Sequence, residues 1–252
     1  MLSAERHRRL VQHLRLHGSG NVTDLAEQLG VSSSTIRRDL RELDERGLVE
    51  RSHGGASAPA GDEPQLQSRV TSHSAEKETI GRAAARMVQA PGTILITGGS
   101  TTEAMVPYLA AYDGLTVVTN ALNIAWQLTR LPQLTVVVLG GVLRHGENSL
   151  LGTITEQALS QLHIDQVFTG ALGIDPDSGI SGAHVQEAGT DRSLLASARQ
   201  VVCLIDSSKF GRRGPVRLAD ITGIDAVVTD GGADPTVVGA LEAHGVRVTL
   251  AT

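Results

Sequence analysis

Hydroxyl and guanidinium side chains share one face of a helix predicted to begin near residue 32. Ser32 and Ser33 can cap its first turn, and Ile36, Leu40 and Leu43 recur at helical spacing, which predicts a buried apolar face. The opposite face carries Ser34, Thr35, Arg37, Arg38 and Arg41. In a DNA major groove hydroxyls reach phosphates and Arg pairs bidentately with guanine, so this face suits DNA reading. The alternative is a charged face that is only solvated.

A second group of residues has the types and spacing of an anion site. In the run TGGSTTEA, Gly98 and Gly99 let the backbone turn closely, while the next three residues place hydroxyls and amides at a helix start. These three are Ser100, Thr101 and Thr102. A generic tight turn is the alternative. Other predicted strands end in Thr119-Asn120, Gly140-Gly141, Gly170 and Asp206-Ser207-Ser208-Lys209, and we expect these ends to converge on one pocket.

The Ser207-Ser208-Lys209 run also suggests an enzyme with a nucleophilic serine, and Lys209 beside Asp206 suggests a general acid. The chain has no HExxH or CxxC metal spacing, and Gly98-Gly99-Ser100 matches neither a Walker loop nor a GxGxxG fingerprint. We therefore expect no metal, no cofactor and no catalytic residues.

The elements around residues 31–45 favour DNA reading over simple solvation. Residues 4–17 form an amphipathic helix, and VTDLAEQLG forms a short second helix, with Thr23 or Asp24 as its cap and Gly30 closing it. Two short helices across a tight turn are typical of a helix-turn-helix. The run LVERSHGGA then predicts a hairpin, with Gly54 and Gly55 supplying the turn. Together these elements predict a winged helix-turn-helix over residues 1–57.

Residues 58–74 are rich in small and polar residues and predict a linker. Beyond it, the chain alternates between short apolar runs and helical stretches. The apolar runs are TILIT, LTVVT, LTVVVLG, QVFTG, VVCLID, AVVTD and VRVTL. Continuous Val, Ile and Leu runs indicate strands buried on both faces. Residues 75–252 are therefore predicted to form one doubly wound, mainly parallel α/β domain.

Composition sets further bounds on the kind of protein. The formal charge of −5 divides into nine Arg against eight acidic residues in 1–57, and thirteen basic against nineteen acidic residues beyond. DNA binding therefore requires the positive groups of 1–57 to lie on one face. The single Cys203 excludes an intrachain disulfide and predicts a buried thiol in a cytoplasmic protein. No apolar run approaches the roughly 20 residues of a membrane span.

The N-terminal residues resemble the DNA-binding domain of the DeoR/GlpR family of bacterial transcriptional repressors. The resemblance rests on Val31-Ser32, Thr35-Ile36-Arg37-Arg38-Asp39-Leu40, Gly47-Leu48 and Arg51-Ser52-His53-Gly54-Gly55-Ala56. It implies that the third helix reads an operator and that the hairpin touches the DNA backbone. The expected DNA contacts are Ser33, Ser34, Thr35, Arg37, Arg38, Arg41, Arg51 and His53.

The C-terminal part is similar to the sensor domains of that family, which resemble ribose-5-phosphate isomerase in fold and surround a sugar phosphate. Both lysines of the chain, Lys77 and Lys209, fall on positions that match. Glu187 is added because relatives often carry Glu in the helix after the GI loop. The implied effector-binding residues are Lys77, Gly99, Ser100, Thr101, Thr102, Asn120, Gly140, Gly141, Glu187, Asp206 and Lys209.

Two departures from the family pattern argue against catalysis. Thr97 and Leu172 stand where many relatives carry Asp, and Leu cannot act as an acid or base. We therefore expect a repressor that binds operator DNA as a dimer or tetramer and responds to a phosphorylated sugar or polyol. The alternatives are a sugar-phosphate isomerase with an appended DNA-binding domain, and an activator or architectural protein whose α/β domain only oligomerises.

Overall fold

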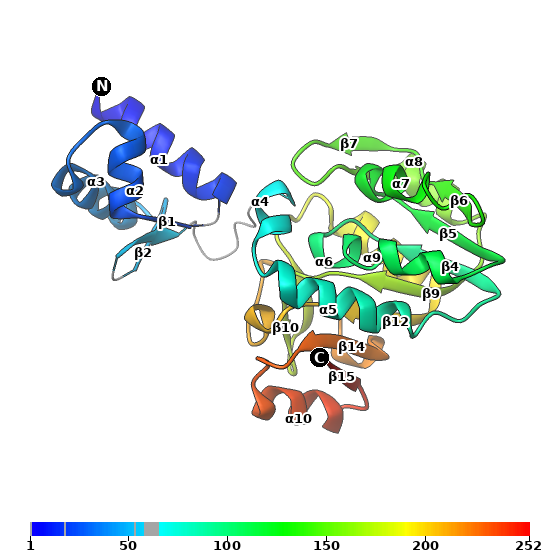
Figure 1. Cartoon of the computed structure of the whole chain (residues 1–252). Helices are drawn as coiled ribbons and strands as arrows, with labels where there is room; N and C mark the ends of the chain where they lie inside the picture. Colours follow the sequence, from blue (N-terminus) through cyan, green and yellow to red (C-terminus); the bar gives the residue numbers. More distant parts are fainter. Residues whose placement is uncertain (1, 18, 53, 58–65) are drawn as a thin grey trace. The chain divides into compact units, whose positions relative to one another are not determined.

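The computed structural model describes residues 2–17, 19–52, 54–57 and 66–252, which form two compact units (Figure 1). Unit 1 spans Met1–Ser72 and unit 2 spans His73–Thr252. Each has its own hydrophobic core, because the buried cluster of unit 1 lies within residues 10–56 and those of unit 2 lie within residues 80–251. No helix of the described chain is long and apolar enough to cross a membrane.

Residues 3–57 of unit 1 contain three helices followed by a hairpin. The helices are α1 (Ser3–His17), α2 (Val22–Leu29) and α3 (Ser33–Glu45). The strands β1 (Ser19–Asn21), β2 (Glu50–Ser52) and β3 (Gly55–Ser57) form an antiparallel sheet in the order β1-β3-β2. Leu10, Leu25 and Ile36 are at most 1% exposed and come from the three helices, so the helices pack around one core.

Two local expectations in unit 1 need correction. The N-cap of α2 is Asn21, whose Oδ1 accepts from the backbone N–H of Asp24 at 2.9 Å, rather than Thr23 or Asp24. Asn21 is also the last residue of β1, a strand that was not predicted from the sequence. Gly55 lies in β3 and not in the turn. Only glycine fits at this position, because a Cβ would lie only 2.1 Å from the Gly20 carbonyl oxygen.

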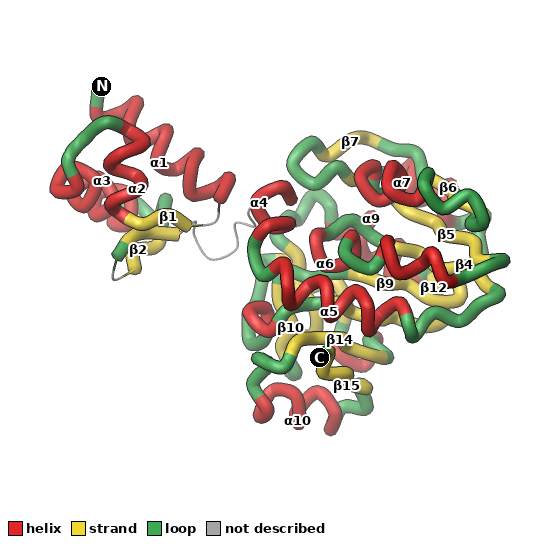
Figure 2. The backbone as a smooth tube through the Cα atoms, viewed as in Figure 1, coloured by secondary structure: helices red, strands yellow, loops and turns green. Residues whose placement is uncertain are grey.

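Unit 2 is built on a parallel seven-stranded sheet, which confirms the predicted α/β fold (Figure 2). Its strands, in spatial order, are β15 (Arg247–Ala251), β14 (Ala226–Asp230), β12 (Ala198–Leu204), β9 (Ile164–Thr169), β4 (Gly92–Ile96), β5 (Leu115–Thr119) and β6 (Thr135–Val138). All seven fall within the predicted apolar runs or overlap them. Every pairing between neighbours is parallel.

Helices cover both faces of this sheet. One face packs against α5 (Ser74–Ala85), η1 (Val106–Ala111) and α7 (Leu122–Leu128), and the short α6 (Ser100–Glu103) precedes η1. The other face packs against α8 (Thr153–Leu159), α9 (Ala188–Ala196) and α10 (Pro235–Ala243). Cys203 on β12 is fully buried, as predicted, and burial raises the pKa of its thiol to about 12.

Two small antiparallel sheets were not anticipated. One pairs β7 (Val142–Arg144) with β8 (Ser149–Leu151), and the other contains β10 (Gly173–Asp175), β11 (Gly179–Gly182) and β13 (Val216–Ala219). Their strands have three or four residues, too few for an alternating pattern to be read in the sequence. The 3-10 helices η2 (Ser207–Lys209) and η3 (Ile221–Gly223) complete unit 2.

Within the expected linker, residues 66–71 form the helix α4 (Leu66–Thr71), and its Leu66 is 2% exposed. The remaining linker residues 58–65 lie outside the described part of the chain. The boundary between the compact units follows Ser72.

Candidate functional site

The exposed face of α3 carries the arginines that the sequence singled out. Arg37, Arg38 and Arg41 are exposed, whereas Ile36 and Leu40 on the opposite face are at most 1% exposed. Ser32 caps the helix, because its Oγ accepts from the Thr35 N–H at 3.2 Å. The Ser32 hydroxyl also lies 2.8 Å from the Ser34 hydroxyl and 2.9 Å from that of Thr35. Ser33 is half-buried in the first turn.

A buried ion pair joins this helix to α1. The Arg6 guanidinium donates to both carboxylate oxygens of Asp39, at 2.5 and 3.0 Å, and His7 Nε2 lies 3.0 Å from the same carboxylate. Asp39 is 1% exposed and Arg6 8%. Burial raises the pKa of Asp39, but the hydrogen bonds from Arg6 and His7 outweigh burial and hold it below its ordinary value of 3.8. Asp39 therefore remains ionised and fixes α3 against α1.

The hairpin places Arg51 on β2, where it is exposed and opposite Ala56. The Arg51 backbone N–H donates to Asp44 Oδ1 at 3.3 Å, which ties β2 to the end of α3. His53 lies outside the described residues, so the expectation for this side chain stays a prediction.

In unit 2, the strand order reverses between β4 and β9, because β5 and β6 extend from one side of β4 and later strands extend from the other. In open parallel sheets ligands bind beyond the carboxyl ends of the strands at such a point. The 98–102 loop leaves β4 there. Gly98 N–H donates to Asn120 Oδ1 at 3.3 Å, so the residues that follow β4 and β5 are joined.

Side chains within this loop differ in their burial and hydrogen bonding. Thr102 is fully buried and its hydroxyl donates to the carbonyl oxygens of Thr97 and Gly99, at 2.8 and 3.0 Å. Its hydroxyl thus shapes the loop. Ser100 and Thr101 are 7% and 8% exposed and begin α6.

Lys77 lies on α5 and is 5% exposed. One helical turn later on the same face, Gly81 packs so closely on the end of α6 that a Cβ would lie 2.5 Å from the Ala104 carbonyl. The face of α5 that carries Lys77 is therefore turned towards α6, which begins within residues 98–102.

The end of β12 is held by two carboxylates. Asp206 is 2% exposed, caps η2 and accepts from both the backbone N–H and the hydroxyl of Ser208. Asp230 accepts from Ser207 N–H at 2.7 Å. Burial raises the pKa of Asp230, and its backbone and side-chain hydrogen bonds from Ser207 lower it by more. The half-buried Lys209 ends this fixed turn.

Gly140 and Gly141 serve close packing against α8. A Cβ on Gly141 would lie 2.2 Å from Thr155 Oγ1, and the Thr155 hydroxyl donates to the Gly140 carbonyl at 2.6 Å. These contacts give a packing reason for the glycine pair in addition to the expected ligand contact.

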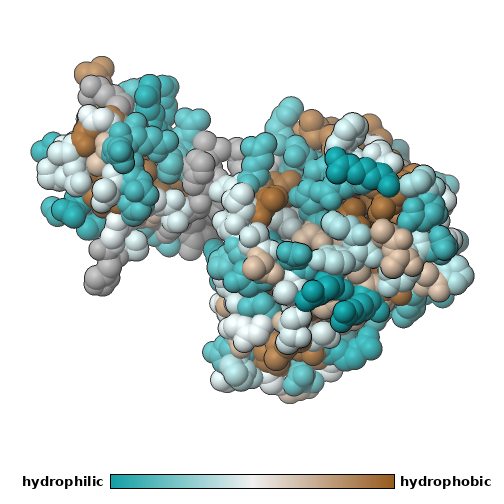
Figure 3. Space-filling view, in the orientation of Figure 1, coloured by the Kyte–Doolittle hydropathy of each residue, from teal (hydrophilic) through white to brown (hydrophobic). Residues whose placement is uncertain are grey.

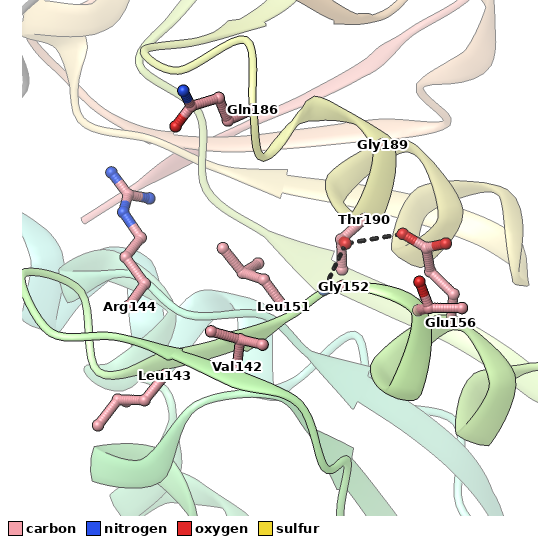
Figure 4. Close-up of a pocket in the computed structure, with 10 residues that line it drawn as sticks. Val142, Leu143, Arg144, Leu151, Gly152, Glu156, Gln186, Gly189 and Thr190 are labelled. Carbon is pink, nitrogen blue, oxygen red and sulfur yellow. Dashed lines mark hydrogen bonds between the residues drawn. The ribbon is translucent and has the colours of Figure 1, made fainter.

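Glu187 pairs with Arg144 of β7 at 2.6 Å. Arg144 also lines an open pocket of about 260 Å³ (Figure 4). Inside the pocket the Thr190 hydroxyl donates to Glu156 at 2.8 Å and accepts from Gly152 N–H at 3.0 Å. Sequence patterns did not single out Arg144, Glu156 or Thr190, because each of the three lies on a separate element.

At the two departures from the family pattern the side chains are buried and carry no charge. The Thr97 hydroxyl donates to the Thr169 hydroxyl at 3.1 Å, which joins the ends of β4 and β9, and Leu172 is 4% exposed. Among the described residues, no three His, Cys, Asp or Glu side chains are grouped to hold a metal ion.

Comparisons with known proteins cover both units. Residues 6–60 match the family model of the DeoR-like helix-turn-helix domain, and residues 72–231 match that of the DeoR C terminal sensor domain. The glycerol-3-phosphate regulon repressor of Escherichia coli (strain K12) is 33% identical over 251 residues, which cover 99% of this chain and 100% of that protein. The transcriptional repressor GlcR of Bacillus subtilis (strain 168) is 31% identical over 253 residues, covering 99% and 97%.

Among solved structures, ribose 5-phosphate isomerase A from Methanocaldococcus jannaschii aligns with a TM-score of 0.42 and 14% identity. The alignment covers 55% of each chain.

Proposed function

The chain belongs to the DeoR family of DNA-binding transcriptional regulators, and we propose that it represses a carbohydrate or polyol catabolic operon under the control of a phosphorylated effector. Members of the family are regulators and not enzymes. The isomerase alternative is disfavoured, and Thr97 and Leu172 supply no acid or base at the strand ends.

The observation that supports DNA reading is the exposed arginine face of α3, a helix that the Arg6–Asp39 ion pair joins to α1. Arg37, Arg38 and Arg41 project from a helix whose other face is buried, so they are free to enter a major groove. Ser33, Ser34 and Thr35 at the helix start and Arg51 on the hairpin contact phosphates. We include His53 by resemblance alone.

The test of DNA reading starts from a random duplex library, from which the full chain selects its preferred sequence. Arg38→Ala should weaken binding to the selected duplex by about 1–3 kcal/mol, the worth of one bidentate contact to a base. Arg9→Ala is the matched control, because Arg9 is an exposed arginine on α1 that pairs with Glu5. Equal affinities of Arg38→Ala and wild type would remove α3 from the reading role.

The effector site lies beyond the carboxyl ends of β4, β5 and β12. It is supported by the 98–102 loop at the strand-order reversal and by the only two lysines of the chain, Lys77 and Lys209, at the same edge of the sheet. Gly99, Ser100, Thr101 and Asn120 surround a phosphate, and Asp206 caps the short 3-10 helix that ends at Lys209. Unequal binding of effector to DNA-competent and DNA-incompetent arrangements is sufficient for regulation.

The effector is sought by thermal-shift screening of phosphorylated sugars and polyols beside their unphosphorylated parents. Lys209→Ala should weaken binding of the best phosphorylated compound in calorimetric titration, because a charge on the phosphate loses its partner. Arg130→Ala, an exposed cation at the opposite edge of the sheet, should bind like wild type. A chain that responds to neither class of compound would instead have an α/β unit that only oligomerises.

The protein acts on DNA in the cytoplasm, and the reduced, fully buried Cys203 is consistent with that compartment. The family architecture supports action as a dimer or tetramer, since helix-turn-helix proteins read paired half-sites with paired copies.

A further inference from the structure

Four apolar side chains of unit 2 remain exposed around one pocket. They are Val142 (72% exposed), Leu143 (36%), Ile154 (60%) and Val185 (74%). The first two line the pocket of Figure 4, and the other two are chain neighbours of Thr153 and Gln186, which also line it. In Figure 3 hydrophobic side chains gather where Figure 1 places β7. We call these four residues and the pocket between them the hairpin surface.

The hairpin surface is tied together by contacts along its length. Ile154 packs against Gly140, since a Cβ added to Gly140 would lie 3.4 Å from Ile154 Cγ2. The Arg144–Glu187 pair, whose side chains are 25% and 17% exposed, connects β7 to the start of α9. These contacts join the chain beside β7 to the start of α8 and β7 itself to the start of α9.

The exposed apolar area of the hairpin surface is comparable with the apolar area of a protein–protein interface. An interface of standard size takes about 800 Å² from each partner, of which somewhat more than half is apolar. The four residues expose on the order of 400 Å², which is the size of the largest apolar patch on a typical monomer, and such a patch is often a functional surface. The apolar area is thus close to what a stable dimer requires.

The charges of the patch fit a second copy of the same chain. Arg144 lies in the pocket together with the carboxylate of Glu156, and Glu187 lies at its edge. A two-fold interface brings a patch against itself, so a patch of one sign would repel its copy. A patch that carries both signs can place the Arg144 of one copy near a carboxylate of the other.

We propose that the hairpin surface is a two-fold interface between two copies of this chain. The inference deepens the proposed function and rests on it in one respect, because a single winged helix reads one half-site and a second copy is needed for the other. Glu187, one of the expected effector residues, pairs at the edge of this patch with Arg144, which lines the pocket. Self-association and the effector site therefore share one ion pair.

Sedimentation of the full-length chain over a range of concentrations tests the interface. Val142→Glu and Ile154→Glu should each raise the dimer dissociation constant at least tenfold, or about 1.4 kcal/mol, because a carboxylate would be buried against its apolar counterpart. Leu250→Glu is the matched control, since Leu250 is 51% exposed at the other edge of the sheet. Thermal unfolding of each variant verifies that unit 2 remains folded.

The outcomes separate the interface from DNA reading. Weakened association in both surface variants, with wild-type affinity for a duplex that holds one half-site, supports the interface. A wild-type chain that stays monomeric, or surface variants that associate as Leu250→Glu does, would overturn it and leave the DNA-binding proposal standing. Failure of the wild type to select any DNA would overturn the DNA-binding proposal alone.

Discussion

At the scale of single residues, the molecule separates the groups that hold its DNA-reading helix from the groups that face outward. Asp39 belongs to the same TIRRDL run as Arg37 and Arg38, yet it points inward to Arg6 and is 1% exposed. A carboxylate buried without a cation lowers the free energy of unfolding by several kcal/mol, so Asp39 depends on Arg6 for its burial. The polarity of the run alone does not distinguish an inward Asp from outward Arg.

Removal of this carboxylate should destabilise unit 1 and change its response to acid. Asp39→Asn removes the carboxylate charge that balances the buried Arg6 guanidinium, and we expect a loss of about 3–5 kcal/mol in the free energy of unfolding of unit 1. Because the folded pKa of Asp39 is lowered, its contribution is complete above the ordinary pKa of 3.8 and is lost as pH falls through the folded pKa. In Asp39→Asn that part of the acid sensitivity should vanish.

Denaturant unfolding measured from neutral pH to below pH 3.8 checks this prediction. Glu45→Gln, which changes an exposed carboxylate on the same helix, is the control and should keep the stability and acid response of wild type. Equal acid responses of Asp39→Asn and wild type would mean that Asp39 does not stabilise α3.

At the scale of elements, the hairpin depends on close backbone approach. β3 lies between β1 and β2, and Gly55 faces the Gly20 carbonyl at a distance that excludes a side chain. Glycine is required there by contact with a strand distant in sequence. Gly54, by contrast, has open space around its Cβ position.

Gly55→Ala should therefore lower the free energy of unfolding of unit 1 by about 1–3 kcal/mol, the usual range for overpacking. It should also weaken DNA binding, because β2 carries Arg51. Gly54→Ala is the matched control and should stay within about 0.5 kcal/mol of wild type. Urea unfolding of the two variants measures the difference. Equal midpoints would show that the sheet accommodates the added methyl group at residue 55 without loss of stability.

At the scale of the whole molecule, the two units do not share a hydrophobic core. The buried cluster of residues 10–56 and the two clusters within 80–251 are separate sets. Each unit therefore carries the apolar burial that its own folding requires.

Residues 73–252 produced alone should unfold cooperatively and bind the phosphorylated effector as the full chain does, with no affinity for the selected duplex. Circular dichroism and calorimetric titration measure folding and binding, and the full-length chain is the control. A fragment that folds but fails to bind the effector would place part of that site outside unit 2. The same experiment tests the predicted division at residues 57–75.

The features that could be predicted from the sequence are those that arise from interactions between residues close together in the chain. The seven apolar runs located the seven parallel strands, and the spacing of Ile36, Leu40 and Leu43 assigned the buried face of α3, because both patterns arise within one element. Ser32 and Gly30 acted as the predicted helix cap and helix end for the same reason.

Only the tertiary structure decided which side chains meet across elements. The pairs Arg6–Asp39 and Arg144–Glu187 join residues 33 and 43 positions apart, and nothing in either local pattern marks the partner. Gly55 and Gly141 likewise owe their identity to a backbone or hydroxyl contributed by another strand or helix. Periodicity records which face of an element is buried, whereas the neighbour against which it is buried is set by the packing of the complete chain.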